Sequence, residues 1–326
     1  MAVFTAIDDP SAYFKVQLYT GDGNDSRTIT FDDTDTDMQP DMIWIKERSS
    51  TSSHYLTDSV RGIGKKLEPD GTGAESTEGL SAVTSDGFTI GTSTNQVNQD
   101  TITHVAWCWK ESATAGFDIV AHTHSGDSSE PSHSLGAAPN FIIWKPRGAT
   151  GSWGVATTPT GITSGYLSLN STGAFVTESG HVDAADASTI TYGQYLTDTT
   201  TITYAWRSIQ GFSKFGSYTG NGNADGTFVY TGFRPAYFMD KRTDSTSSWI
   251  IIDNKMNPNN DGAVTNQWAE GAYADNTNNY GFDILSNGIK IRDTTNNLNT
   301  SGGNYIFLCF AEAPFVNSKG VPCNAR

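Results

Sequence analysis

One short phrase occurs three times in this chain of 326 residues, and its spacing restricts the fold more than any other feature. Each copy has a proline, an apolar run and a lysine six positions after the proline, as in "PDMIWIKER", "PNFIIWKPR" and "PAYFMDKR". The proline–lysine pairs are Pro40 and Lys46, Pro139 and Lys145, and Pro235 and Lys241. The lysines are 99 and 96 residues apart, which indicates three tandem units of similar length.

Two further phrases keep the same order in every copy. A ring stands eight positions after each lysine, and each copy closes on an aromatic run, "HVAWCWK", "TITYAWRS" or "YIFLCFAE". The rings after the lysines are His54, Trp153 and Trp249, and the equivalent residues of the closing runs are Trp109, Trp206 and Phe310. We therefore divide the chain into an N-terminal segment (1–12), unit 1 (13–111), unit 2 (116–210), unit 3 (211–313) and a C-terminal tail (314–326).

The local pattern of each unit favours strands over helices. Runs such as "MIWI", "FIIW" and "WIII" are short, apolar and rich in β-branched and aromatic residues, and Gly, Asn, Asp and Ser fill the segments between them. The best candidate for a short helix is "TDSVRGIGKKLE", residues 57–68. About 95 residues of strands and tight turns are typical of a sandwich. The sequence therefore predicts an all-β protein of three tandem β-sandwich repeats, of jelly-roll or lectin-like type.

We interpret the repeated phrase as one strand and the loop that follows it. Proline suits a strand end, because its missing N–H costs no ladder bond there. The apolar run is a core strand, the lysine follows at its far end, and the serine- and threonine-rich stretch is a hairpin loop that leads to the ring eight positions on. We expect the three lysines to bond carbonyl or carboxylate groups at the sandwich rim; a role in ligand binding is the alternative.

Charge and cysteine content exclude several classes of partner. The net charge is −15, which argues against nucleic acid and against anionic membrane surfaces, because both need clustered Lys and Arg. The three cysteines, Cys108, Cys309 and Cys323, form neither a disulfide framework nor a zinc pattern, which fits synthesis in a reducing cytoplasm. No signal-peptide pattern and no apolar run of about 18 residues is present, so membrane insertion is not expected.

Metal sites are weakly indicated. Gly116, His122, His124 and Glu130 approximate the signature of cupin barrels, but Glu130 is too distant and a second motif with another histidine is missing. We expect no metal there. Oxygen side chains in two glycine-rich turns are weak calcium candidates. They are Asp22, Asn24 and Asp25 in "GDGND", and Asn221, Asn223 and Asp225 in "GNGNAD".

No catalytic motif is apparent, and no cofactor is expected. The chain has no G-x-S-x-G elbow, zincin helix, phosphate loop or dinucleotide fingerprint. Aromatic residues beside turns and polar loops could instead stack on sugars. The weak candidates for carbohydrate binding are Trp153, Trp249, Tyr218 and Tyr230, with core packing as the alternative for most of them.

Unit 1 resembles a repeat domain of tail-fibre-like and other virion proteins of marine bacteriophages. The residues that carry the resemblance are "PDMIWIKERS", "TDSVRGIGKKL", "SDGFTIG" and "VAWCWK". In unit 3, "FSKFGSYTGNGNADGTFVYTGFRPAYFMDKR", "SNGIKIR" and "YIFLCFAEAPF" resemble the same family, as does the closing "NSKGVPCNAR". The resemblance covers nearly the whole chain and is weakest in unit 2. It implies a virion component, made in the bacterial host cytoplasm, and supplies no catalytic residue.

We therefore expect a non-enzymatic structural subunit of a bacteriophage virion, in the tail, a tail fibre or the capsid surface, that contributes to attachment to host-surface glycans. A carbohydrate-binding adhesin module is the first alternative. A glycan-degrading enzyme is the second, because its paired carboxylates can be distant in sequence.

Self-association is a further expectation. Short linkers between the units suggest a rigid rod or wedge, and wedges repeat well around an axis, so a homo-oligomer, with a trimer favoured, is predicted. The two ends carry apolar residues that have no equivalent in a third copy: Phe4, Tyr13, Phe14, Phe315 and Val316. We expect these ends to pack against a neighbouring subunit or another virion protein.

Overall fold

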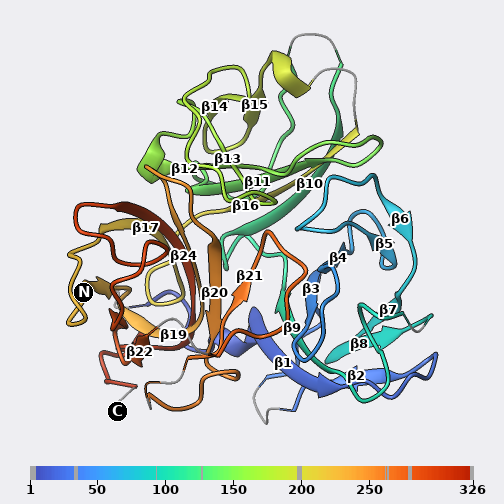
Figure 1. Ribbon diagram of the computed structural model, residues 1–326. Coiled ribbons are helices and arrows are strands. Elements are labelled where there is room, and N and C mark those ends of the chain that lie inside the picture. Colours follow the sequence, from blue (N-terminus) through green and yellow to red (C-terminus); the bar gives the residue numbers. More distant parts are fainter. Residues whose placement is uncertain are drawn as a thin grey trace.

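The computed structural model describes residues 5–32, 36–92, 94–125, 128–196, 200–260, 262, 264–277 and 281–323. This part of the chain is all-β, with several separate sheets, none of which closes on itself (Figure 1). Its helices are three single 3₁₀ turns: η1 (Pro10–Ala12), η2 (Thr158–Thr160) and η3 (Gln194–Leu196). No helix in the described ranges has the length and apolar character needed to cross a bilayer.

Each unit contributes one large antiparallel sheet. In unit 1 the order is β1 (Phe14–Thr20), β9 (Thr103–Trp109), β3 (Met42–Glu47), β4 (Tyr55–Asp58). In unit 2 it is β10 (Phe117–Thr123), β16 (Thr200–Trp206), β11 (Phe141–Pro146), β12 (Gly154–Thr157), β13 (Leu167–Ser168). In unit 3 it is β17 (Ser213–Thr219), β24 (Asn304–Pro314), β19 (Phe233–Arg242), β20 (Trp249–Asp253), β21 (Gln267–Trp268). The closing aromatic strand of every unit thus lies between its first strand and its proline–lysine strand.

The register is the same in the three large sheets. The lysine of each proline–lysine strand lies opposite the residue four positions before the last ring of the closing strand. These pairs are Lys46 with Val105, Lys145 with Ile202, and Lys241 with Ile306. The sequence repeat therefore corresponds to one topological position in all three sheets.

Smaller sheets lie beside the large ones. Unit 1 has β2 (Thr28–Thr30), β8 (Gly87–Ile90) and β7 (Leu80–Thr84), and unit 3 has the matching β18 (Phe228–Tyr230), β23 (Gly288–Ile291) and β22 (Phe282–Leu285). Within the described residues of unit 2, the smaller sheet is the pair β14 (Val182–Ala185) and β15 (Ile190–Tyr192). A further pair in unit 1 joins β5 (Lys65–Lys66) to β6 (Ser76–Thr77). Unit 2 therefore departs most from the common plan.

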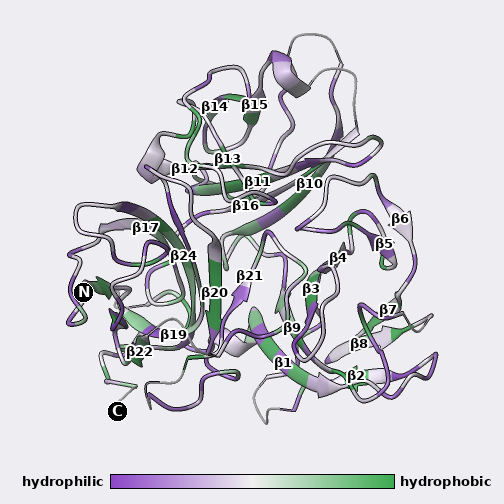
Figure 2. Ribbon diagram, viewed as in Figure 1, coloured by the Kyte–Doolittle hydropathy of each residue, from purple (hydrophilic) through white to green (hydrophobic). Residues whose placement is uncertain are grey.

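Both faces of each large sheet are buried, in two different cores. Side chains alternate along a strand, so in β9 the residues Val105, Trp107 and Trp109 face one side, and Ala106 and Cys108 face the other. The first set joins a cluster that draws residues from all three units, and the second joins a cluster of unit 1 alone. Figure 2 shows the hydrophobic colour concentrated on the large-sheet strands around this shared centre, as in β1, β10 and β20.

The three units close into a ring within the single chain (Figure 1). The aromatic side chain eight positions after each lysine donates to a backbone carbonyl of the preceding unit, so that the three contacts form a cycle. Trp153 Nε1 donates to Glu68 O of unit 1 (2.8 Å), and Trp249 Nε1 donates to Ser168 O of unit 2 (2.9 Å). His54 Nε2 lies 2.9 Å from Trp268 O of unit 3 and completes the cycle.

The tautomer of His54 follows from its other neighbour. The indole N–H of Trp44 donates to His54 Nδ1 at 2.8 Å, so Nδ1 is the acceptor and the proton lies on Nε2, toward Trp268 O. Burial lowers the pKa of His54 to about 3, so the imidazole is neutral at physiological pH. A neutral imidazole therefore does in unit 1 what an indole does in units 2 and 3.

Three expectations are wrong: the rod shape, the short helix at residues 57–68, and the packing of Tyr13 and Phe14 against a neighbouring subunit. The units form a closed ring rather than a rod, because their large sheets share one core. Residues 57–68 do not form a helix: β4 ends at Asp58, and Gly62 and Gly64 adopt positive φ angles of 103° and 88°, which a helix does not allow. Tyr13 and Phe14 pack within the chain. Tyr13 lies edge-on to Phe212, and Phe14 is buried in the shared core.

The two ends of the chain lie close together. Ser318 N donates to Asp8 Oδ1 at 2.6 Å, which joins the two ends. The N-terminal segment also contacts the last residue of unit 2, because Thr5 Oγ1 donates to the carbonyl of Gln210 at 3.1 Å. Residues 1–4, which include Phe4, and residues 324–326 lie outside the described part of the chain.

Candidate functional site

The repeated lysines are structural. Each Nζ is buried and donates to the carbonyl of the next residue at 2.7 Å: Lys46 to Glu47, Lys145 to Pro146, and Lys241 to Arg242. Lys145 and Lys241 also donate across the unit boundary, to Thr72 O and Thr172 O, at 3.3 Å each. Burial lowers the pKa of all three lysines to about 8. Their carbonyl bonds match the structural role expected from the sequence.

Three of the four sequence candidates for sugar stacking are wrong. Trp153 and Trp249 are 0% and 1% exposed, because their indoles lie between units. Tyr218 is buried, its ring stacks on Tyr305 at 4.8 Å, and its hydroxyl donates to Asp240. Burial leaves these three rings almost no surface for stacking on a sugar, although Trp153 also lines the cavity described below. Tyr230 is exposed, with the ammonium of Lys214 5.0 Å from its ring centre.

The calcium candidates are engaged by protein groups. A buried asparagine holds each glycine-rich turn: Asn98 Nδ2 donates to Asp22 Oδ1 (2.8 Å) and Asn24 O (2.9 Å). Asn299 Nδ2 makes the matching bonds in unit 3, to Asn221 Oδ1 (2.9 Å) and Asn223 O (2.8 Å). The carboxylate of Asp225 lies 2.9 Å from Lys290 Nζ and 3.1 Å from Arg292 Nη1, and Asp25 also has a partner. Among the described residues, no three His, Cys, Asp or Glu side chains converge to hold a metal.

His122 occupies a structural position of the repeat. It lies on β10 where β1 carries Tyr19 and β17 carries Tyr218, and its ring stacks on Tyr192 at 5.1 Å. Burial lowers the pKa of His122 to about 4, so the imidazole is neutral at physiological pH. Ser129 Oγ lies 2.7 Å from His124 Nδ1. The two histidines therefore serve packing and a local hydrogen bond.

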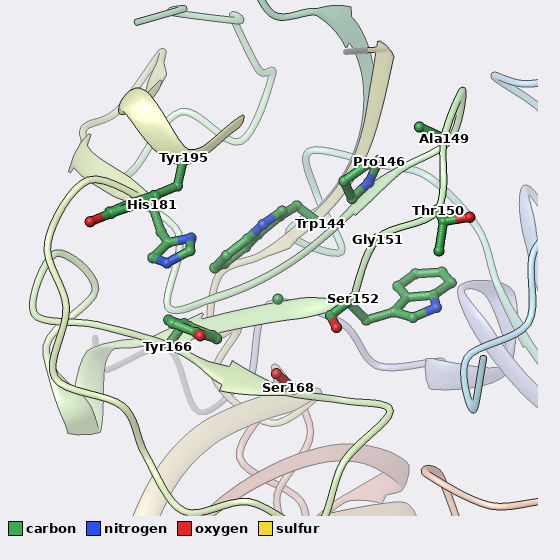
Figure 3. Close-up of a pocket in the computed structure, with 12 residues that line it drawn as sticks. Trp144, Pro146, Ala149, Thr150, Gly151, Ser152, Tyr166, Ser168, His181 and Tyr195 are labelled. Carbon is green, nitrogen blue, oxygen red and sulfur yellow. The ribbon is translucent and has the colours of Figure 1, made fainter. Parts of the chain in front are cut away.

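Unit 2 has a hollow lined by aromatic residues (Figure 3). We call this cavity of about 390 Å³ the aromatic pocket. The residues that line it are Trp144, Pro146, Ala149, Thr150, Gly151, Ser152, Trp153, Gly154, Tyr166, Ser168, His181 and Tyr195. They come from β11, the loop before β12 and its first residue, β13 with its preceding residue, the residue before β14, and η3.

Trp144 forms the floor of the aromatic pocket because a glycine lies beneath it. Trp144 on β11 pairs with Gly154 on β12, and a Cβ atom at Gly154 would lie only 2.0 Å from Trp144 Cζ2. The indole therefore lies over the glycine backbone. Ile45 and Asp240 occupy the equivalent position in units 1 and 3, so neither unit can present this ring.

Three more rings complete the wall. The imidazole of His181 lies 4.2 Å from the ring of Tyr166, 4.8 Å from Tyr195 and 6.0 Å from Trp144, measured between ring centres. His181 Nε2 lies 3.1 Å from Glu178 Oε2, which holds the imidazole in place. Figure 3 shows Trp144, Tyr166 and His181 around the same hollow, with Ser152 and Ser168 beside them.

The composition of the aromatic pocket is that of a binding site. Its lining has no Lys, Arg, Asp or Glu, so it lacks a pair of carboxylates for acid–base work. Aromatic rings with a few hydroxyl and amide groups are the usual composition of a small-molecule site. Flat apolar rings can pack against the apolar face of a sugar while serine and threonine hydroxyls bond its polar edge. Sequence reasoning missed this site, although the unlike residues at positions 45, 144 and 240 were a signal of it.

Buried acids elsewhere connect the units. Trp107 Nε1 of unit 1 donates to Asp253 Oδ2 of unit 3 at 2.9 Å, and Tyr204 of unit 2 donates to Asp58 Oδ2 of unit 1 at 2.6 Å. Burial raises the pKa of Asp253 to about 6. Asp58 also accepts from Arg61, with Nε 2.5 Å from Oδ2. Because Asp58 and Asp253 are fully enclosed, we assign them to packing between units.

The fold and the aromatic pocket define an all-β protein of three cyclically packed units, one of which carries a concave aromatic surface. The chain belongs to the DUF7483 family, a domain of unknown function, whose model matches residues 9–314. Neither the curated proteins nor the solved structures that were searched contain a match.

Proposed function

We propose that this protein binds a glycan, without catalysis, through the aromatic pocket, as a structural subunit on the surface of a bacteriophage virion. The observation that carries the binding proposal is the group of four rings from Trp144, Tyr166, His181 and Tyr195 around one cavity whose described lining has no Lys, Arg, Asp or Glu. The virion part of the proposal comes from the phrases in units 1 and 3 that resemble phage virion proteins. A free carbohydrate-binding adhesin is the second candidate, favoured by the same pocket.

We interpret each unit as a β-sandwich of jelly-roll or lectin-like type. In units 1 and 3 a large sheet and a three-stranded sheet share a local apolar cluster, as the two layers of a sandwich do. Unit 2 has its own local cluster beneath a smaller second sheet.

Self-association remains part of the proposal, with other virion proteins as further partners. The wedge argument for a trimer loses its force, because three units already surround one centre inside a single chain. An assembly of whole chains would use the outer surfaces of the ring.

A glycan array followed by calorimetry tests the proposal. The labelled full-length protein is screened on bacterial and algal glycans, and the best binder is titrated into wild type, Tyr195→Ala and Tyr230→Ala. Both tyrosines are about half exposed, but only Tyr195 lines the aromatic pocket. Tyr195→Ala should weaken binding about tenfold, or ~1.4 kcal/mol, and Tyr230→Ala should not change it. Equal affinities in both variants, or hydrolysis of the glycan, would contradict the proposal.

A further inference from the structure

A second depression lies at the boundary between units 2 and 3. We call it the seam groove; its volume is about 590 Å³. It is lined by Asn170, Ser171, Thr172, Ser248, Trp268, Glu270 and Tyr273. The first three residues belong to unit 2 and the others to unit 3, so the groove exists only because the two units are packed together.

The seam groove has an aromatic wall and a fixed polar floor. The rings of Trp268 and Tyr273 meet edge to face with their centres 5.3 Å apart, and Tyr273 is 56% exposed. Glu270 Oε2 accepts the backbone N–H of Trp249 at 3.0 Å, and Asn170 Oδ1 accepts that of Trp153 at 2.9 Å. These bonds hold both polar side chains in place and leave Asn170 with an amide N–H₂ to donate.

The seam groove adjoins the aromatic pocket. Ser168 lines the pocket and Asn170 lines the groove, and two residues of extended chain span at most ~7 Å. The two hollows also use equivalent positions of units 2 and 3. Ser152 and Ser248 both precede the ring that donates across the boundary, and Ser168 and Trp268 pair with the residues that follow that ring.

We infer that the seam groove is a second saccharide subsite, continuous with the aromatic pocket, so that the ligand is an extended oligosaccharide rather than a single sugar. This inference rests on the proposed glycan binding. The ligand is neutral, because the described pocket lining has no Lys or Arg, the charged side chain of the groove lining is the carboxylate of Glu270, and the chain carries a net charge of −15. Such a surface repels sulfated and uronic acid glycans.

Calorimetry with neutral oligosaccharides of one to six residues tests this inference. The probes are gluco-, manno- and galacto-oligosaccharide series, titrated into the full chain as wild type, Tyr273→Ala, Tyr273→Phe and Tyr195→Ala. In the wild type, affinity should rise with chain length within at least one series. Tyr273→Ala should abolish that rise, with a loss of at least fivefold for the longest probe and none for the monosaccharide. Tyr273→Phe should restore the rise, and Tyr195→Ala should weaken every length.

The outcomes separate the two claims. If Tyr273→Ala equals wild type at every length while Tyr195→Ala weakens binding, the groove is not a subsite and the proposed function stands. If no probe of any length binds to the wild type, both claims fall. Tighter binding of a sulfated hexasaccharide than of its neutral counterpart would overturn the neutral specificity.

Discussion

Trp107→Phe tests whether the buried contact between units 1 and 3 holds the ring of units together. The indole N–H of Trp107 donates to Asp253 Oδ2, and the carboxylate also accepts the backbone N–H groups of Lys255 and Met256. Phenylalanine keeps an aromatic ring against Trp44 and Tyr237, which lie 5.8 and 5.6 Å from Trp107. The substitution therefore removes one hydrogen bond to a buried acid with little change in shape.

The expected loss has two parts with different pH dependence. The smaller ring buries less apolar surface, which costs roughly 1–2 kcal/mol at any pH. The lost bond costs about 1.5–3 kcal/mol when Asp253 is ionised and about 0.5–1.5 kcal/mol when it is protonated. Because the pKa of Asp253 is raised from 3.8 to about 6, it is mostly protonated at pH 5 and ionised at pH 8. The decrease in unfolding free energy should thus be about 1 kcal/mol larger at pH 8.

Guanidinium unfolding at pH 5 and pH 8 measures this difference, with Trp109→Phe as the control. Trp109 is equally buried in the shared core, but in the described part of the chain its Nε1 has no hydrogen-bond partner. The decrease in unfolding free energy caused by Trp109→Phe should be the same at both pH values. A pH-independent decrement for Trp107→Phe, or one no larger than that of Trp109→Phe, would refute the role of the Trp107–Asp253 bond.

Three other substitutions have defined outcomes. Gly154→Ala places a methyl group against Trp144, so it should lower the unfolding free energy by about 1–3 kcal/mol and weaken glycan binding. Unchanged binding would show that Trp144 does not shape the site. Trp206→Ala removes a buried ring that stacks on Phe117 and should cost about 3–5 kcal/mol in denaturant titrations, and a loss below 1 kcal/mol would contradict its core role. Burial raises the pKa of Glu111 to about 7, so its stabilising contribution is present below pH 4.5 and is lost as pH rises through 7. Glu111→Gln should therefore reduce the fall in unfolding free energy between pH 5 and 8, and an unchanged slope would contradict that assignment.

The sequence predicts the repeat but not the way its copies pack. Prolines, lysines and closing rings are side-chain features, and they marked the positions that share one register. The contacts that close the ring of units end on backbone carbonyls, at Glu68, Ser168 and Trp268, whose side chains are unrelated. An acceptor that every residue possesses leaves no pattern to find. The sequence alone therefore does not distinguish a row of separate sandwiches from a closed ring of units.

The same limit explains the errors about the candidate site. Trp153 and Trp249 follow polar loops, which is typical of exposed residues, but each indole N–H donates to a carbonyl of the preceding unit. The true pocket depends on Trp144, which sits in a run that reads as core strand. Trp144 is 2% exposed, and its place in the pocket lining comes from Gly154 beneath it and from His181, which lies distant in sequence.

Covalent linkage of the three units has a consequence for how such a protein can vary. In a trimer of identical chains, any substitution appears three times, so a change that opens one hollow opens all of them. Here the position before the repeated lysine differs freely: Ile45 fills a local core, Trp144 shapes a hollow, and Asp240 is a buried acid bonded to Tyr218. A substitution in one unit therefore leaves the equivalent positions of the other two units unchanged. Selection can act on the binding surface of one unit without altering the cores of the others.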